Sequence, residues 1–174
     1  SPSKDLGADD RYTVKSVPLL TARAGRAFHE MTPIRYTPAE PGRVYRTIHY
    51  GPLLDVFFLD MRTYRGPNTG DTQGEAGADM VFLGATQIAW LKRELTASRA
   101  TWKVIAADMP IGLVVPDGDT RIEAIANGEP GKPLGRELEI ADLLRTIRDA
   151  GIDNVVWFTA DVHYTAAHYY DPSK

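Results

Sequence analysis

The stretch Leu53-Leu54-Asp55-Val56-Phe57-Phe58-Leu59-Asp60 is almost entirely apolar. Apolar side chains at both odd and even positions are typical of a strand that is covered on both faces of its sheet. Just before it, two sets of side chains alternate along a strand-like segment, and Gly51-Pro52 then turns the chain. One set is Val44, Arg46, Ile48 and Tyr50, and the other is Tyr45, Thr47 and His49. We therefore predict a β-hairpin over residues 44–60 whose second strand is covered on both faces.

Helical and strand-like patterns alternate through the rest of the chain. The most regular helical spacing joins Ile140, Leu143, Leu144 and Ile147, and Gly151 is a typical helix stop. Together the patterns predict helices at 18–31, after Gly84 and around 140–147, and buried strands at 102–107 and 155–159. Helices that alternate with apolar strands indicate a layered α/β sheet.

Less regular segments connect these elements. Residues 1–12 are polar and residues 66–79 are rich in glycine, so we expect both segments to be flexible. Within the Gly/Pro-rich excursion 116–133 we predict a short helix around 122–126. A further strand is predicted over 166–170.

Composition limits the class of protein. A chain of 174 residues is about one domain. The net charge of −3 gives no large basic surface, which argues against nucleic acid as a partner, and the absence of cysteine excludes disulfides. No apolar run of about 18 residues is present, so we predict no membrane span. The start of the sequence resembles the interior of a longer chain rather than a secretion leader.

Polar residues follow three of the predicted strands. They are Asp60 to Arg62, Asp108, and Asp161 to His163. Ligands bind at the carboxyl ends of strands in sheets of this kind. We therefore predict a functional site where these strand ends converge.

Asp161 and His163 offer a carboxylate and an imidazole two residues apart. At a strand end such residues point the same way and suit Fe, Mn or Zn, while the carboxylate alone also suits Ca²⁺. In the alternative interpretation Asp161 caps a turn and His163 is a hydrogen-bonded surface residue. Spacing alone leaves both interpretations open.

Several ordered motifs carry a resemblance to a known family. Residues 154–164, ending in Asp161-Val162-His163-Tyr164, are similar to the last metal motif of the PhoD-type alkaline phosphatase/phosphodiesterase family, usually Gly-Asp-Val-His, with Ala160 in place of the glycine. Residues 50–65 resemble the family segment YGxLxDxFxLDxRxYR, and residues 83–91 resemble LGxxQxxWL. The resemblance extends from about Ala22 onward.

The resemblance implies a fold and an activity. The fold would be part of a layered α/β/β/α metallophosphatase sandwich with a mixed sheet, and residues 1–174 would be a single partial catalytic domain, its C-terminal half. The activity would be metal-dependent hydrolysis of phosphate esters with Fe and Ca, or alternatively Mn or Zn, in a secreted periplasmic or extracellular protein. Asp161 and His163 would bind metal.

The family's other metal motifs, a strand-end Gly-Asp and an Asp-His-Glu block, do not occur here. We therefore expect the chain alone to be inactive and its partner to be the missing N-terminal half. A half sandwich should expose an apolar sheet face, through which the chain would dimerise, aggregate or stay bound to that half.

Three further residues are candidates for the site. Asp108 precedes Met109-Pro110 where the wider superfamily has a metal-binding histidine, or it caps a loop. Arg62 either contacts substrate phosphate or forms a structural ion pair with Asp60. His168 either protonates the leaving group or supports the ligands.

Two other functions stay open at this point. The chain could be a non-catalytic binding module that retains the phosphatase scaffold. It could also be a hydrolase with a single metal ion held by Asp108, Asp161 and His163, which requires the three side chains to meet at one point.

Overall fold

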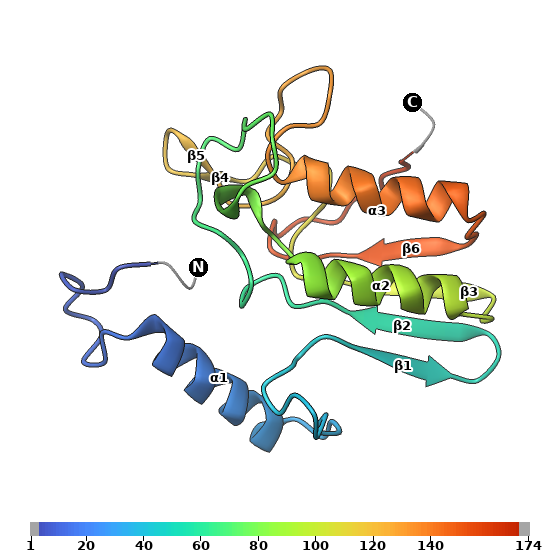
Figure 1. Ribbon diagram of the computed structural model, residues 1–174, viewed down its shortest axis with the longest axis horizontal. Helices are drawn as coiled ribbons and strands as arrows, with labels where there is room; N and C mark the ends of the chain where they lie inside the picture. The colour runs from blue at the N-terminus through green and yellow to red at the C-terminus, as the bar shows by residue number, and fades with distance from the viewer. Residues whose placement is uncertain (1–3, 171–174) are drawn as a thin grey trace.

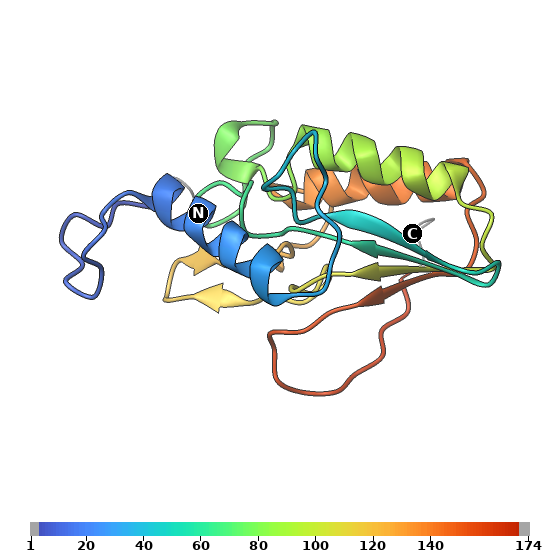
Figure 2. The same ribbon diagram turned by 90° about the horizontal axis from the view of Figure 1, so that it is seen from below.

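The protein has one four-stranded mixed sheet with two helices packed on one side (Figures 1 and 2). The computed structural model describes residues 4–170. The strands are β1 (Arg46–Tyr50), β2 (Leu54–Phe58), β3 (Trp102–Ala106) and β6 (Val155–Phe158), in the order β1-β2-β3-β6. β1 is antiparallel to β2, and the other pairs are parallel. The predicted layered α/β class is confirmed.

The hairpin and the helices lie where the sequence patterns place them. Gly51 turns the chain between β1 and β2 with a left-handed φ of 69°. The helices are α1 (Val17–Met31), α2 (Ala85–Ala97) and α3 (Glu137–Asp149). Among the described residues, no helix is long and apolar enough to cross a membrane.

Helix α1 lies to the side of the sheet rather than on the face that carries α2 and α3 (Figures 1 and 2). The Ser16 hydroxyl caps its start by accepting from the Leu19 N–H at 3.4 Å, and Pro18 occupies the first turn. The helix ends at Met31, just before Thr32-Pro33. Its buried residue is His29, whose Nδ1 lies 2.8 Å from the Gly25 carbonyl oxygen.

The two faces of the sheet differ. Phe57 and Ile105 point to the helices and are 0% exposed. On the other face, Phe58 is 39% exposed and Phe158 is 66% exposed. Figure 2 shows both helices on one side of the strands, while the segment after β6 loops out on the other side. The prediction that β2 is covered on both faces is therefore wrong, because no second layer among residues 4–170 packs on the open face.

Helices α2 and α3 are joined by a long-range cap. The Glu139 carboxylate on α3 accepts hydrogen bonds from the N–H groups of Phe82, Leu83 and Gly84, at 3.2, 2.7 and 2.9 Å. These groups immediately precede α2, whose N-cap residue Gly84 has no side chain to offer. Burial raises the pKa of Glu139 although these hydrogen bonds oppose the rise. A residue of one helix thus replaces the local cap of the other.

The connecting segments contain the remaining short elements, and two predictions for these segments are wrong. The short elements are η1 (Ala78–Met80), β4 (Pro116–Asp117) and β5 (Arg121–Ile122). The predicted helix at 122–126 is absent, because Ile122 belongs to β5 and the Glu123 N–H donates to the Val115 carbonyl at 2.7 Å. Residues 166–170 have no strand pairing, so the predicted strand there is also wrong. The flexibility of 66–79 and 1–12 stays a prediction, and residues 1–3 lie outside the described range.

Candidate functional site

The carboxyl ends of β2, β3 and β6 bring together polar side chains, as predicted. Arg62 follows β2, and its Nε donates to Asp108 Oδ2 at 2.5 Å just after β3. Its Nη2 lies 3.6 Å from Asp161 Oδ1, after β6. Arg62 is therefore the point at which the three strand ends meet.

Glu123 is a member of this cluster that the sequence analysis missed. Its Oε1 accepts a hydrogen bond from Arg62 Nη1 at 2.8 Å. Burial would lower the pKa of Arg62, but the hydrogen bonds to Glu123 and Asp108 outweigh burial and raise it. Glu123 lies in the excursion that was predicted as a loop with a short helix. No spacing motif connects it to Arg62, so its role is visible only in the folded chain.

Arg62 does form ion pairs, but with Asp108 and Glu123 rather than with Asp60 as predicted. Asp60 Oδ1 instead accepts from the backbone N–H groups of Arg62 at 3.0 Å and Thr63 at 2.9 Å. The Asp60 N–H and carbonyl are both bonded to the buried Gln87 side chain. Asp60 therefore fixes the turn after β2. Contact between Arg62 and a substrate phosphate stays a prediction.

Asp161 and His163 lie in a bend after β6, which ends at Phe158. The strand geometry that we used to align the two side chains therefore does not apply to them. Both residues have left-handed backbone, with φ of 75° and 55°. Such conformations cost on the order of 1–3 kcal/mol in a non-glycine residue and cluster at functional sites. The site roles of Asp161 and His163 stay predictions.

His168 lies further along the same exposed segment. Its ring stacks on that of Tyr170, with the ring centroids 6.3 Å apart. Within the described part of the chain, no hydrogen bond joins His168 to Asp161 or His163. Its predicted contribution to leaving-group protonation or ligand support is untested.

The described residues 4–170 do not assemble a full set of ligands for a metal ion. Residues 4–170 contain no group of three His, Asp or Glu side chains placed to hold a metal ion. Asp108 and Asp161 instead contact Arg62. The three-ligand site of the alternative mononuclear hydrolase is therefore not assembled. The carboxylate of Asp161 and the imidazole of His163 suit a metal chemically, and together they are two ligating side chains.

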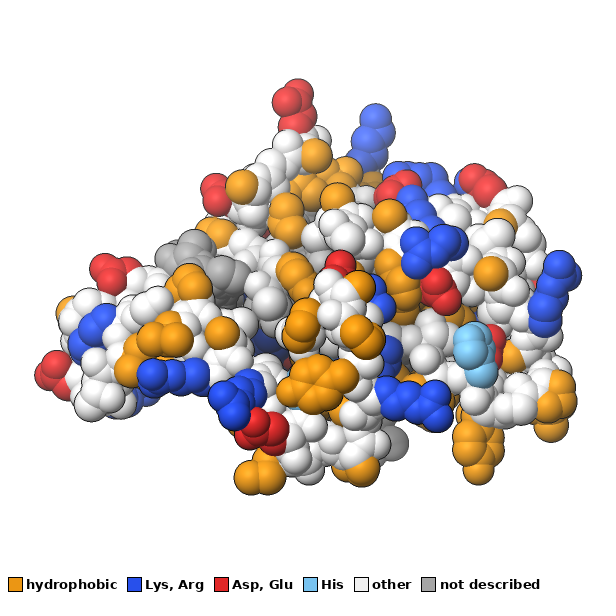
Figure 3. All heavy atoms as spheres, turned by 60° about the horizontal axis from the view of Figure 1, so that its bottom comes forward, with side chains coloured by type: hydrophobic (Ala, Val, Ile, Leu, Met, Phe, Trp, Pro, Cys, Tyr) orange, Lys and Arg blue, Asp and Glu red, His pale blue; other side chains and the backbone are white. Residues whose placement is uncertain are grey.

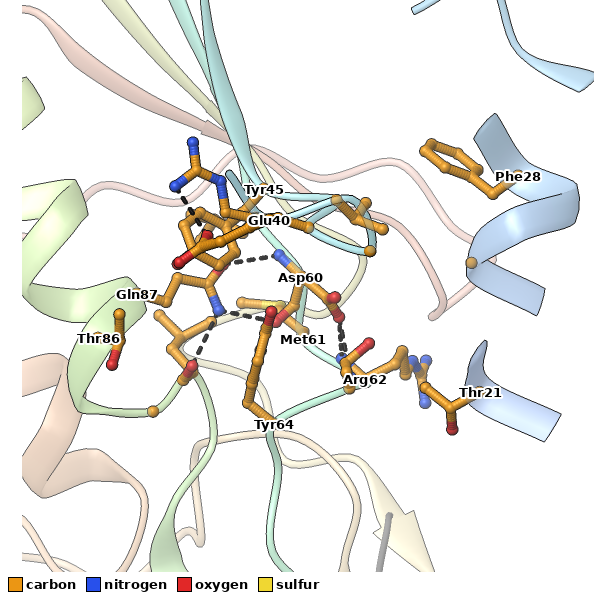
Figure 4. A pocket seen from close by; sticks show the side chains of 18 of the residues that line it. Thr21, Phe28, Glu40, Tyr45, Asp60, Met61, Arg62, Tyr64, Thr86 and Gln87 are labelled. Carbon is orange, nitrogen blue, oxygen red and sulfur yellow. Dashed lines mark hydrogen bonds and ion pairs between the residues drawn. The ribbon is translucent and has the colours of Figure 1, made fainter. Parts of the chain in front are cut away.

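A hollow of about 1130 Å³ opens beside the cluster, between α1 and the body of the protein (Figure 3). Arg62 and Asp108 line it. Figure 4 shows Thr21 and Phe28 of α1 across from Asp60 and Arg62. The predicted site therefore has open space next to its arginine, as a binding site requires.

Known proteins resemble this chain over most of its length. The model of the PhoD-like phosphatase family matches residues 3–174. Alkaline phosphatase D of Bacillus subtilis (strain 168) is 28% identical over 162 residues, which are 87% of this chain and 27% of that protein. A solved structure of PhoD superposes with a TM-score of 0.61 at 25% identity, covering 82% of this chain and 28% of the other. The chain thus spans about a quarter of the length of these relatives.

Proposed function

This chain belongs to the PhoD-like phosphatase family, and from that premise we propose that it forms part of the active site of a phosphoester hydrolase. The observation that carries the proposal is the convergence of Arg62, Asp108 and Asp161 at the carboxyl ends of three strands. Substrate binding at this edge is the rule for open α/β sheets.

We further propose that the site is shared with a second part of the catalytic domain. Two features support this proposal: one apolar face of the sheet is open, and residues 4–170 contain no group of three His, Asp or Glu side chains placed to hold a metal ion. The other part would supply the remaining ligands and cover the open face. The chain alone is then inactive, and its self-association would reflect the uncovered sheet.

In the completed site, each residue of this chain has a specific task. Asp161 and His163 hold metal, with Fe and Ca as the proposed ions and Mn or Zn as alternatives. A bound metal ion of this kind polarises phosphoryl oxygens and lowers the pKa of a bound water. Arg62 presents its positive charge to the phosphoryl oxygens, where negative charge develops during the reaction. Asp108 holds Arg62 or ligates metal, and His168 protonates the leaving group or supports the ligands.

The substrate class is a phosphate monoester or diester. Export to the periplasm or the extracellular space is also a proposal, and it rests on the family resemblance.

Substitution of His163 tests the proposal. In the natural full-length polypeptide that carries this chain, His163→Ala should reduce hydrolysis of p-nitrophenyl phosphate and bis-p-nitrophenyl phosphate by at least about 100-fold, because a ligand is lost. Elemental analysis should show less bound metal. His49→Asn is the matched control, since His49 lies on β1 and bonds Asp55, not the cluster around Arg62. Unchanged metal content and rate in the His163 variant would refute the proposal.

A further inference from the structure

Glu123 connects the cluster of Arg62, Asp108 and Asp161 at the strand ends with a buried pair of arginines. On its outer side, its carboxylate binds Arg62. On its inner side are Arg65 and Arg136, whose guanidinium groups lie 4.6 and 5.0 Å from the ring centre of Phe82. Arg136 is 0% exposed. We call Arg65, Arg136 and Phe82 the two-arginine cluster.

The two-arginine cluster fixes the backbone that carries Glu123. Arg136 Nη1 donates to the carbonyl oxygens of Ile122, Glu123 and Ala124, at 3.1, 3.0 and 3.0 Å. Arg65 Nη2 donates to the same Glu123 carbonyl. The Glu123 N–H is bonded to Val115. Both backbone polar groups of Glu123 are therefore held, and its side chain leaves the backbone at a fixed place.

The positive charges of Arg65 and Arg136 favour a negatively charged side chain at position 123. Burial, followed by the charges of Arg136 and Arg62, lowers the pKa of Arg65 to about 10. The Glu123 charge acts in the opposite direction on both buried arginines. If that negative charge were removed, Arg62 would lose one of its carboxylate partners and keep Asp108 and Asp161. Arg62 would then be held less firmly at the strand ends.

We propose that Glu123 is a positioning residue, which holds Arg62 beside Asp108 and Asp161 and is itself fixed by the two-arginine cluster. This inference rests on the proposed function, in which Arg62 contacts the substrate phosphate. Glu123 does not touch the substrate. Its effect on the reaction passes through Arg62 alone.

The test compares isosteric variants in the natural full-length polypeptide. Glu123→Gln removes the charge and keeps the shape. It should raise KM for p-nitrophenyl phosphate, and Ki for inorganic phosphate, by about tenfold, the scale of one lost charged hydrogen bond. The kcat should change less than KM, and the thermal midpoint should stay near that of the wild type. Glu129→Gln is the matched control, because Glu129 is exposed in the same excursion.

A double-variant cycle decides whether the effect passes through Arg62. Arg62→Gln combined with Glu123→Gln should be no worse than Arg62→Gln alone. Additive losses would overturn the proposal, as would an unchanged KM or unfolding of Glu123→Gln. A wild-type protein that neither hydrolyses the ester nor binds phosphate would instead refute the proposed function. The two failures are therefore distinguishable.

Discussion

The two faces of the central sheet have similar side chains but different surroundings. Phe57 and Phe58 are adjacent residues of β2, yet Phe57 is buried under the helices and Phe58 points to the open side. The open face continues across all four strands through the paired residues Ile48, Val56, Val104 and Val156. An extended apolar row of this kind is typical of an interaction surface. The comparison teaches that a strand can be apolar on both faces while residues 4–170 cover only one of them.

Removal of Phe57 tests the covered face and should have the largest effect on stability. Phe57→Ala should lower the free energy of unfolding by about 3–5 kcal/mol, because a fully enclosed ring leaves a cavity. Urea unfolding of the 174-residue chain, followed by circular dichroism, measures the change. A loss below about 1 kcal/mol would show that the helices do not enclose this face.

Asp71 is a buried carboxylate beside Arg136, at the start of α3, and it tests whether a buried charge lowers the stability of the protein. The residue is 1% exposed, its Oδ1 accepts from the Arg136 N–H at 2.9 Å, and its Oδ2 has no partner among the described residues. Burial raises the pKa of Asp71 from 3.8 to about 6, against the hydrogen bond and charge of Arg136. The folded state therefore binds more protons than the unfolded state between about pH 4 and 6, and stability falls as pH rises through that window.

Asp71→Asn should remove this loss of stability. The variant should be close to the wild type near pH 4 and more stable by about 3 kcal/mol at pH 7, since a shift of about two pKa units corresponds to about 1.4 kcal/mol per unit. Asparagine also tolerates the left-handed φ of 58° at this position. Urea unfolding at several pH values measures the difference. Parallel pH profiles for the two proteins would contradict the prediction.

Phe58 tests the open face and should have the smallest effect. In the 174-residue chain, Phe58→Ala should cost less than about 1 kcal/mol, because the ring is already partly exposed. In the natural full-length polypeptide the cost should rise above about 2 kcal/mol if another layer covers this ring. Urea unfolding of both forms measures the pair of values. Equal small costs in the two forms would show that the face stays open.

The sequence predicted local structure and the region of the site better than it predicted contacts. The periodicity of Ile140, Leu143 and Ile147 located α3, because a helix buries one stripe of its own residues. The strand-end rule placed Arg62, Asp108 and Asp161 in one region, which the structure confirms. The contact with Glu123 was not predictable, since it depends on where a long connection folds back. The segment 122–126 was misassigned because buried arginines, rather than helical hydrogen bonds, satisfy the carbonyls of residues 122–124.

The cap that Glu139 forms on α2 has a consequence for the order of folding. The N–H groups of the three residues just before α2 find their acceptor on a residue more than fifty positions later in the chain. The cap at the start of α2 therefore forms only after α3 has docked, and closing such a long loop costs conformational entropy. The two helices should then form late and together, and in the native protein they should open to solvent as one cooperative unit.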